Sequence, residues 1–416
     1  MLVSCYIARR VMDLFGETKV VEKQDEVRLD IPVPEDNRNG DDEALAAAKR
    51  AKKILIRRPG MVAGQMPWYD RRNVKTWRHA AQLGFVLLNV FLCVQFYFWV
   101  RYYETGGATL KVARPDGVGG WLPIAGLMNL KYALTTFEIP PIHAAAMFLL
   151  AAFLLISVLF KKTFCSWLCP VGTLSEALWR LGQRVFGRAF LPPRWLDLPL
   201  RSLKYLLMAV FLYVVVTMSA DAIEAFMVSP YGLIADVKML NFFRYIGNTA
   251  LITIIVLMIG SVFIKNLWCR YLCPYGALVG LLSLLSPFKV RRDAEACIDC
   301  AKCAKVCPAQ LPVDRKSQIR SAECTACLSC VAICPAQDAL QFSLRPARKT
   351  AANGDAQGIN RRWRRRTLSG AMLTLLLVVV VGGVIGAAKW SGYWETQIPE
   401  PMYQRLIPMA QQLAHP

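Results

Sequence analysis

Histidine is scarce in this sequence: the 416 residues contain only His79, His143 and His415. A b-type haem inside a helical bundle normally needs two facing histidines, and only His143 lies in a long apolar segment. The motif C-x-x-C-H is absent too, so no c-type haem attachment is expected. The sequence therefore disfavours haem as a cofactor.

Acidic residues are also few, with 29 Asp and Glu against 50 Lys and Arg, which gives a formal net charge of +21. Yet 55% of the residues are hydrophobic, and the mean hydropathy is +0.34. The two properties fit together if the chain crosses a membrane and its basic residues gather on one side. The segment from Met1 to Phe15 lacks a long apolar core, so no cleavable signal peptide is expected.

Five apolar runs are long enough to be membrane-spanning helices. They cover residues 80–100, 142–160, 203–219, 247–264 and 368–388. Residues 121–137 are also partly apolar, but Pro123 and Lys131 interrupt them, so an interfacial segment is expected there. With the N-terminus inside, the inside segments hold 42 Lys and Arg and the outside segments hold 8. This bias predicts an inside N-terminus and an outside C-terminus.

Eight of the fourteen cysteines form two copies of C-x2-C-x2-C-x3-C-P. In this bacterial ferredoxin pattern, three thiolates of a run hold one [4Fe–4S] cluster and the fourth ligates the other cluster. The expected ligands are Cys297, Cys300, Cys303 and Cys334 for one cluster, and Cys324, Cys327, Cys330 and Cys307 for the other. Structural zinc is disfavoured because it takes two separated pairs of ligands. Disulfides are disfavoured where thiols stay reduced.

Four further cysteines belong to an internal repeat. Residues 157–174 and 261–278 are identical at nine of eighteen positions with a constant offset of 104. Each copy reads as a span, a C-x3-C-P turn and a helix, so two copies predict a four-helix core with a pseudo-two-fold axis along the membrane normal. If the copies face each other, four thiols converge. They are Cys165, Cys169, Cys269 and Cys273.

The occupant of this cysteine quartet stays open at the sequence level. Residues four apart share one face of a helix. The Pro after each motif starts a new helix, whose N-terminus stabilises a thiolate. Four such thiolates suit a further iron–sulfur cluster or a soft metal such as Cu(I) or zinc. Reversible thiol chemistry and simple packing are the alternatives.

These features divide the chain into six parts. The expected parts are a basic inside tail (1–79), a membrane core (80–286), a two-cluster α+β ferredoxin domain (287–345), a basic linker (346–367), a fifth span (368–388) and an outside tail (389–416). The ferredoxin core should be small and stapled by its clusters. The arginine-rich end of the linker directly precedes an apolar run, so it predicts topology, and no nucleic-acid partner is expected.

The spans, the two C-x3-C-P turns and the double ferredoxin run together resemble the membrane-bound polyferredoxin family of NapH, NosR and their relatives. The resemblance covers roughly residues 80–345. This family accompanies periplasmic nitrate and nitrous-oxide reductases. It is associated with electron passage between the quinone pool and periplasmic enzymes, or with the maturation of metal centres. The resemblance therefore implies an electron-transfer protein of the bacterial cytoplasmic membrane, with quinone and a redox protein as partners.

The sequence departs from individual family members in three ways. NosR-type members carry an outside flavin domain, whereas residues 1–79 are too short and on the wrong side, so no FMN is expected. NapH-type members are shorter and usually lack the long N-terminal tail and the fifth span. The oxidase accessory protein CcoG, linked to copper reduction, has a larger C-terminal domain than residues 389–416 could form.

Two functions of different classes follow. In the first, the chain is an electron conduit or quinol dehydrogenase, and His143, at the outer end of the second span, is a candidate quinol site together with Glu138, Asp221 and Glu224. In the second, the quartet holds or reduces a soft metal such as copper for the maturation of a metalloenzyme. A sensor lacks a supporting DNA-binding motif, and the scarcity of charges in the spans disfavours a transporter.

Overall fold

The computed structural model describes residues 73–187, 192–294, 296–336, 339–344 and 367–413. The chain divides into a unit Met1–Ile56 and a unit Arg57–Pro416, and every described residue belongs to the second unit. The expectations for most of the N-terminal tail and for most of the basic linker lie outside the described residues.

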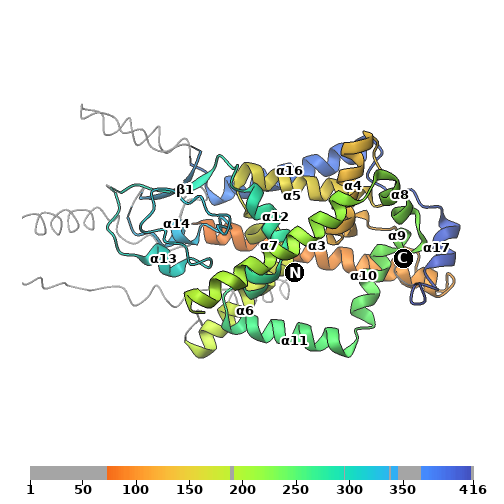
Figure 1. Cartoon of the computed structure of the whole chain (residues 1–416), viewed down its shortest axis with the longest axis horizontal. Coiled ribbons are helices and arrows are strands. Elements are labelled where there is room, and N and C mark those ends of the chain that lie inside the picture. Colours follow the sequence, from red (N-terminus) through yellow and green to blue (C-terminus); the bar gives the residue numbers. More distant parts are fainter. Residues whose placement is uncertain (1–72, 188–191, 295, 337–338, 345–366, 414–416) are drawn as a thin grey trace, which may run out of the picture. The chain divides into compact units, whose positions relative to one another are not determined.

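Long apolar helices dominate the described part of the chain (Figure 1). Three of them are long and apolar enough to cross a membrane: α3 (Val74–Glu104), α7 (Arg194–Thr217, counted from Trp195) and α16 (Gly370–Trp390). A fourth span results if α10 (Ala235–Arg244) and α11 (Asn248–Phe263) count as one, although they meet at 78°.

The expected second span is the apolar helix α5 (Ala144–Phe160), which has 17 residues. A helix of this length rises about 26 Å, slightly less than the roughly 30 Å of a bilayer's hydrocarbon core. Length and composition therefore support three or four spans, and the count of five stays a prediction.

The expected interfacial segment contains a regular helix, α4 (Pro123–Thr136), which packs along α5. Pro123 does not interrupt this helix because it stands in the first turn, where no N–H is required. Lys131 is accommodated because its ammonium donates to the carbonyls of Val215 and Val216 at the end of α7, at 3.0 and 2.8 Å. The two helices approach closely at Gly126, where a Cβ would lie 2.7 Å from the Ala146 carbonyl oxygen.

The ferredoxin unit lies at one end of these helices (Figure 1). Its elements are the antiparallel strands β1 (Lys289–Arg292) and β2 (Leu340–Ser343) and the short helices α13 (Lys302–Val306) and α14 (Ser329–Ile333). Its apolar core includes Val290, Ile319, Leu328 and Phe342, each at most 3% exposed. Because every element has four or five residues, little apolar surface holds the unit together.

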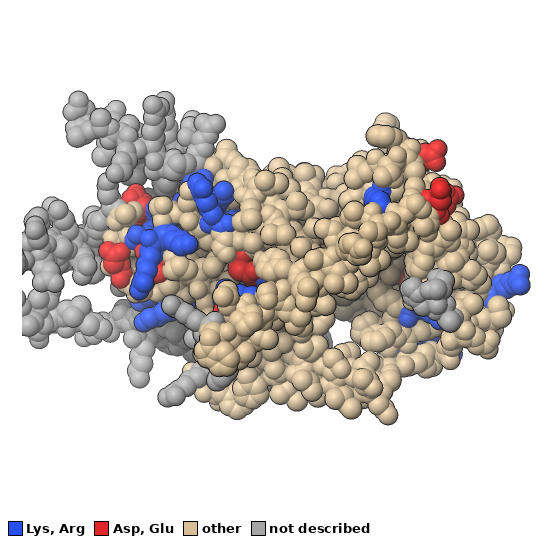
Figure 2. All heavy atoms as spheres, in the orientation of Figure 1, with Lys and Arg blue, Asp and Glu red and all other residues tan. Residues whose placement is uncertain are grey.

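A second apolar core lies at the opposite end of the helices. It is built from the end of α3, from η3 (Asp116–Trp121), α8 (Ala220–Val228), α9 (Pro230–Leu233) and α10, and from α17 (Glu400–Leu406). Residues 389–413 therefore pack onto the helices, with the Tyr403 ring 4.9 Å from the Trp99 ring. Figure 2 shows charged residues near both ends and very few over the middle of the helices, as expected for a lipid-facing band.

Candidate functional site

The two C-x3-C-P segments have the same local structure. In each, one π-helical turn, η4 (Phe164–Leu168) or η5 (Trp268–Leu272), leads into a helix that starts at the motif's Pro, α6 (Pro170–Phe186) or α12 (Pro274–Leu282). The cysteine before each Pro caps its helix. The Cys169 Sγ accepts from the Gly172 N–H at 3.4 Å, and the Cys273 Sγ accepts from the Gly276 N–H at 3.2 Å. Helix N-termini therefore point at two of the four thiols, where they favour negative charge.

The structure brings the quartet together. Cys269 lies within electrostatic range of Cys273, Cys169 and Cys165. All four side chains line one cavity of about 320 Å³. In the described residues, no three His, Cys, Asp or Glu side chains are arranged to hold a single metal ion. The quartet and the ferredoxin cysteines are included in this statement.

Burial sets the protonation of the quartet. Removal from water raises the pKa of Cys165 to about 12 and that of Cys169 to about 11. As free thiols at neutral pH they would be protonated and poor nucleophiles, which weighs against reversible thiol chemistry. A bound metal centre, in contrast, deprotonates its thiol ligands outright.

Buried cations lie beside the quartet, in the case of Lys162 and Lys204, and beside Cys324 of the second ferredoxin run, in the case of Lys161. Lys161, Lys162 and Lys204 are 0, 3 and 0% exposed. Only Lys204 has a carboxylate partner, Glu323, at 2.6 Å; in the described part of the chain neither Lys161 nor Lys162 forms an ion pair. Uncompensated buried charge is costly, so an anionic partner is expected at this place. A [4Fe–4S] core bound by four thiolates supplies one, and the residues present therefore fit such a group.

Lys162 lies between two groups of cysteines. It is within electrostatic range of Cys165 and Cys273 of the quartet, and also of Cys324 in the second ferredoxin run. A Cβ at position 280 would lie 3.4 Å from the Lys162 Nζ, so Gly280 leaves room for the ammonium. One buried positive charge thus faces both candidate cluster sites.

The second ferredoxin run is hydrogen-bonded to the first C-x3-C-P turn. Ser166 donates to the Thr325 carbonyl at 2.6 Å, and the fully buried Trp167 donates its indole N–H to the Ala326 carbonyl at 3.2 Å. The Lys161 ammonium donates to the Ser321 carbonyl at 2.9 Å. These bonds hold the loop before Cys327 directly against the quartet.

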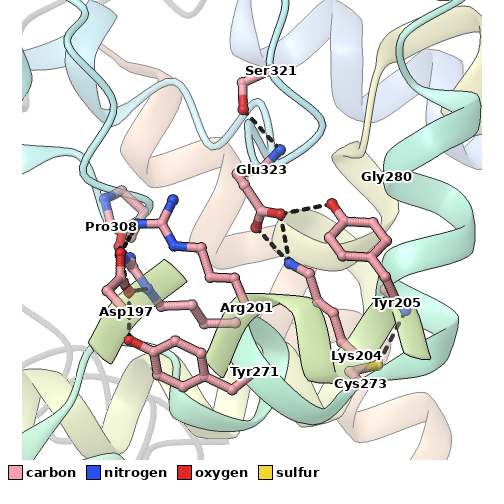
Figure 3. A network of polar contacts seen from close by, with 12 residues as sticks. Asp197, Arg201, Lys204, Tyr205, Tyr271, Cys273, Gly280, Pro308, Ser321 and Glu323 are labelled. Carbon is pink, nitrogen blue, oxygen red and sulfur yellow. Dashed lines mark hydrogen bonds and ion pairs between the residues drawn. The ribbon is translucent and has the colours of Figure 1, made fainter. Parts of the chain in front are cut away.

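Charged residues reinforce this contact on a second side, shown in Figure 3. The Glu323 carboxylate accepts from Lys204 at 2.6 Å and from the Tyr205 hydroxyl at 2.8 Å. Burial alone would raise the pKa of Glu323, but attraction by Lys162 and Lys204 outweighs it and leaves the pKa below its ordinary value. Glu323 is therefore a carboxylate at neutral pH and compensates part of the buried positive charge.

Beside Glu323, a further ion pair joins α7 to the turn η5. The Asp197 carboxylate accepts from the Arg270 guanidinium at 2.9 Å and from the Tyr271 hydroxyl at 2.7 Å, and Arg201 forms an ion pair with it as well. Arg270 in turn donates to the Pro308 carbonyl, directly after the first ferredoxin run, at 3.4 Å. The second C-x3-C-P turn is thereby connected to the ferredoxin unit.

On a third side, Arg78 of α3 connects the second ferredoxin run with α6, the helix that follows the first C-x3-C-P turn. Its guanidinium is 2% exposed, donates to the Cys327 carbonyl at 3.3 Å and pairs with Glu176 at 2.6 Å. Gln82 also donates to Glu176, at 3.0 Å. Burial raises the pKa of Glu176, but the attraction of Arg78 and Arg180 leaves it lower than usual, so the pair is ionised at neutral pH.

Replacing Glu176 with alanine is expected to destabilise the protein by about 3–5 kcal/mol, because Arg78 would remain buried and unpaired. Denaturant unfolding in detergent, followed by far-UV circular dichroism, measures the loss. Lys111→Ala is the matched control: it removes an ion pair with Glu400 in which both side chains are about half exposed, and should leave the midpoint unchanged. An equal change in both variants would contradict the role given to Arg78.

The structure also groups the ferredoxin cysteines. Cys334 lies within electrostatic range of the first run's Cys297, Cys300 and Cys303. Cys307 lies beside the second run, and Cys307, Cys324, Cys327 and Cys330 all line one small cavity. The fourth cysteine of each run thus lies near the other run.

His143 is not part of the cavity beside the quartet. It precedes α5 with a left-handed φ of 54°, is 2% exposed, and its Nε2 lies 2.9 Å from the Gly232 carbonyl oxygen. Of the other outer candidates, Glu224 accepts from the Tyr132 hydroxyl at 3.4 Å. The quinol role of His143 stays a prediction.

Sequence reasoning missed Arg78, Lys162, Glu176 and Glu323 as members of the site. The sequence contains one signal for buried positive charge near the cysteines. Lys161 and Lys265 occupy the same position of the internal repeat, directly after an apolar run, and both are buried. Glu176 and Arg180 are four residues apart on the amphipathic helix α6, which reads as an ordinary surface pair. Their partners lie far away in the chain, so no local pattern identifies them.

Two family profiles match the sequence. One, described as a 4Fe-4S binding domain, matches residues 142–189 and again 247–293, and each match contains one C-x3-C-P turn. The other, a 4Fe-4S dicluster domain, matches residues 289–335, which contain both ferredoxin runs. YccM of Escherichia coli (strain K12) is 54% identical over 359 residues, which are 86% of this chain and 97% of YccM. Its name describes it as a candidate electron transport protein.

The chain belongs to the 4Fe-4S membrane proteins related to YccM, NapH, NosR and NirI. The ferredoxin-type protein NapH of E. coli (strain K12) is 28% identical over 172 residues, 40% of this chain and 55% of NapH. The regulatory protein NosR of Pseudomonas aeruginosa is 29% identical over 167 residues, 39% of this chain and 23% of NosR. No solved structure matches. The family resemblance seen in the motifs is confirmed.

Proposed function

We propose that this protein transports electrons in a membrane through iron–sulfur centres and links the quinone pool to a respiratory or periplasmic redox partner. The observation that carries the proposal is the direct contact of the second ferredoxin run with the first C-x3-C-P turn, through Ser166 and Trp167. A contact of this kind places two sets of cysteine thiols side by side. The name of YccM, with its reference to electron transport, supports the same conclusion.

The proposed ligands form three sets. One cluster is held by Cys297, Cys300, Cys303 and Cys334, a second by Cys324, Cys327, Cys330 and Cys307, and a third centre by Cys165, Cys169, Cys269 and Cys273. Such centres supply one-electron transfer when bound. The repeated 4Fe-4S profile match at both C-x3-C-P turns supports the third centre.

We propose that the three sets act in series. Cys300 of the first set is exposed, whereas Cys330 of the second set is 8% exposed and lies in the interior of the unit. The loop before Cys327 is hydrogen-bonded to the turn between Cys165 and Cys169. We propose that the first cluster exchanges electrons with a soluble or peripheral redox protein and that the quartet faces the membrane.

We also propose an orientation in the bacterial cytoplasmic membrane. The basic residues lie overwhelmingly in the segments that share a side with the ferredoxin unit, and the positive-inside rule then places that unit in the cytoplasm and the C-terminus in the periplasm. Reaching an acceptor in the periplasm would need a partner subunit or quinone itself.

The experiment that tests the proposed function is anaerobic addition of a short-tail quinol to the purified, detergent-solubilised protein, followed by cluster EPR. Reduced [4Fe–4S] signals should grow with added quinol until the centres are reduced. Signals that appear only with dithionite, at every quinol concentration, would exclude the quinone link and favour a metal-handling role or a cytosolic donor.

A further inference from the structure

The cavity beside the quartet continues along the apolar helices. Its wall includes Phe85, Leu88 and Leu92 of α3, and Val381 and Ile385 of α16. Leu149 and Phe153 of α5 line it as well. A volume of about 320 Å³ at this depth fits an apolar, ring-sized molecule with a tail.

The cavity lies directly beside the exposed side of α3. Leu88 lines it and is also 48% exposed, and this helix is a candidate span. Trp121 lines the cavity too and is 40% exposed. Partly exposed apolar side chains of a candidate span therefore form part of the wall, which suits a lipid-soluble molecule.

The inner end of the cavity is polar and adjoins the cysteines. Tyr275 of α12 lines it, packs edge-on against the Phe164 ring at 5.7 Å and lies within electrostatic range of Cys165, Cys169 and Cys273. Its hydroxyl makes no hydrogen bond with another residue of the described chain. A phenol in this position can donate to a carbonyl oxygen of a bound ring.

We propose that this cavity is the binding site of a lipid-soluble quinone, with the ring beside Tyr275 and the quartet and the apolar tail along α3, α5 and α16. The inference rests on the proposed function and gives the quinone link a place. It combines an apolar cavity walled by candidate spans, a phenol without a hydrogen-bond partner in the described residues, and a candidate iron–sulfur site at one end. It also locates the ring away from His143, which does not line the cavity.

The redox step balances with the centres already proposed. One bound quinol becomes a quinone by losing two electrons and two protons. The electrons pass singly to two iron–sulfur centres, each of which is reduced by one electron, and the protons go to water. The reverse step would reduce a quinone to a quinol with two electrons from the same centres and two protons from water.

Two variants of neighbouring residues on α3 test the site. Leu88→Trp fills the cavity, whereas Leu87→Trp places the same side chain on a residue that is 59% exposed and does not line it. The readout is the rate of anaerobic cluster reduction by a short-tail ubiquinol or menaquinol, with total dithionite-reducible cluster as the measure of integrity. Leu88→Trp should slow quinol-driven reduction at least about tenfold, because the larger side chain occupies space that the quinone needs and the quinone then buries less apolar surface. Leu87→Trp should react like the unaltered protein.

The outcomes separate this inference from the proposed function. If the unaltered protein is reduced by quinol and Leu88→Trp reacts equally fast, the site is wrong and the proposed function stands. If quinol reduces no variant, the quinone link itself falls and the site with it. Should Leu88→Trp lose its clusters, Val381→Trp on the opposite wall replaces it, with the exposed Val379→Trp as its control. Tyr275→Phe should raise the KM for quinol and leave the dithionite-reducible cluster content unchanged.

Discussion

Replacing Cys165 and Cys269 together with serine is expected to remove about four iron atoms per chain, because one [4Fe–4S] centre would lose two of its four thiolates. Each motif would then contribute a single cysteine, and neither copy could compensate for the other. The measurement is iron and acid-labile sulfide per chain after purification without oxygen. Quinol-driven reduction of the remaining ferredoxin clusters should be lost in the same variant.

Cys93→Ser is the matched control for this loss. Cys93 is exposed on the lipid-facing side of α3, belongs to no motif and should leave the iron content unchanged. An iron content that is the same in the double variant and the control would remove the third centre. Copper bound by the unaltered protein and lost only in the double variant would favour the metal-handling alternative instead.

Replacing Cys330 with alanine is expected to unfold the ferredoxin unit while the membrane helices stay folded. Its strands and helices have four or five residues each, so its stability depends on the clusters more than on apolar burial. We expect the loss of both ferredoxin clusters and cleavage by added protease within residues 288–343 at least about tenfold faster than in the unaltered protein.

Limited proteolysis with mass spectrometry, together with helical circular dichroism, measures this effect. Cys93→Ser should keep the original protease resistance. A Cys330→Ala protein that retains the other ferredoxin cluster and resists protease would show that the apolar core around Val290 and Phe342 is sufficient to hold the unit.

The helical segments show where local patterns succeed. Residues 368–388 were recognised as one apolar run, and the structure has α16 over Gly370–Trp390. The segment with Pro123 and Lys131 shows where they mislead. Both residues look like interruptions, but Pro123 stands in a first helical turn and Lys131 is satisfied by carbonyls at the end of α7. The second fact depends on a residue 84 positions away, which no local window contains.

The site shows the same division. Cysteine spacing alone indicated iron–sulfur chemistry, because the ligands of such a centre come from a few adjacent turns of chain. Arg78 was not identified, because its partners Glu176 and Cys327 lie 98 and 249 residues away. Nor was the cavity, whose walls come from several separate helices.

By itself, therefore, the sequence determined which cysteines form groups, that the chain contains apolar helices, and that its basic residues segregate between them. These properties can be read from motif spacing, from apolar runs and from counts of basic residues, so none of them requires knowledge of the packing. Only the tertiary structure decided that the second cysteine run meets the first C-x3-C-P turn, that Lys161 and Lys162 are buried there and form no ion pair within the described residues, and that a cavity extends from the quartet along α3. These properties arise when distant segments pack, because burial and charge compensation are set by the partners that folding brings together.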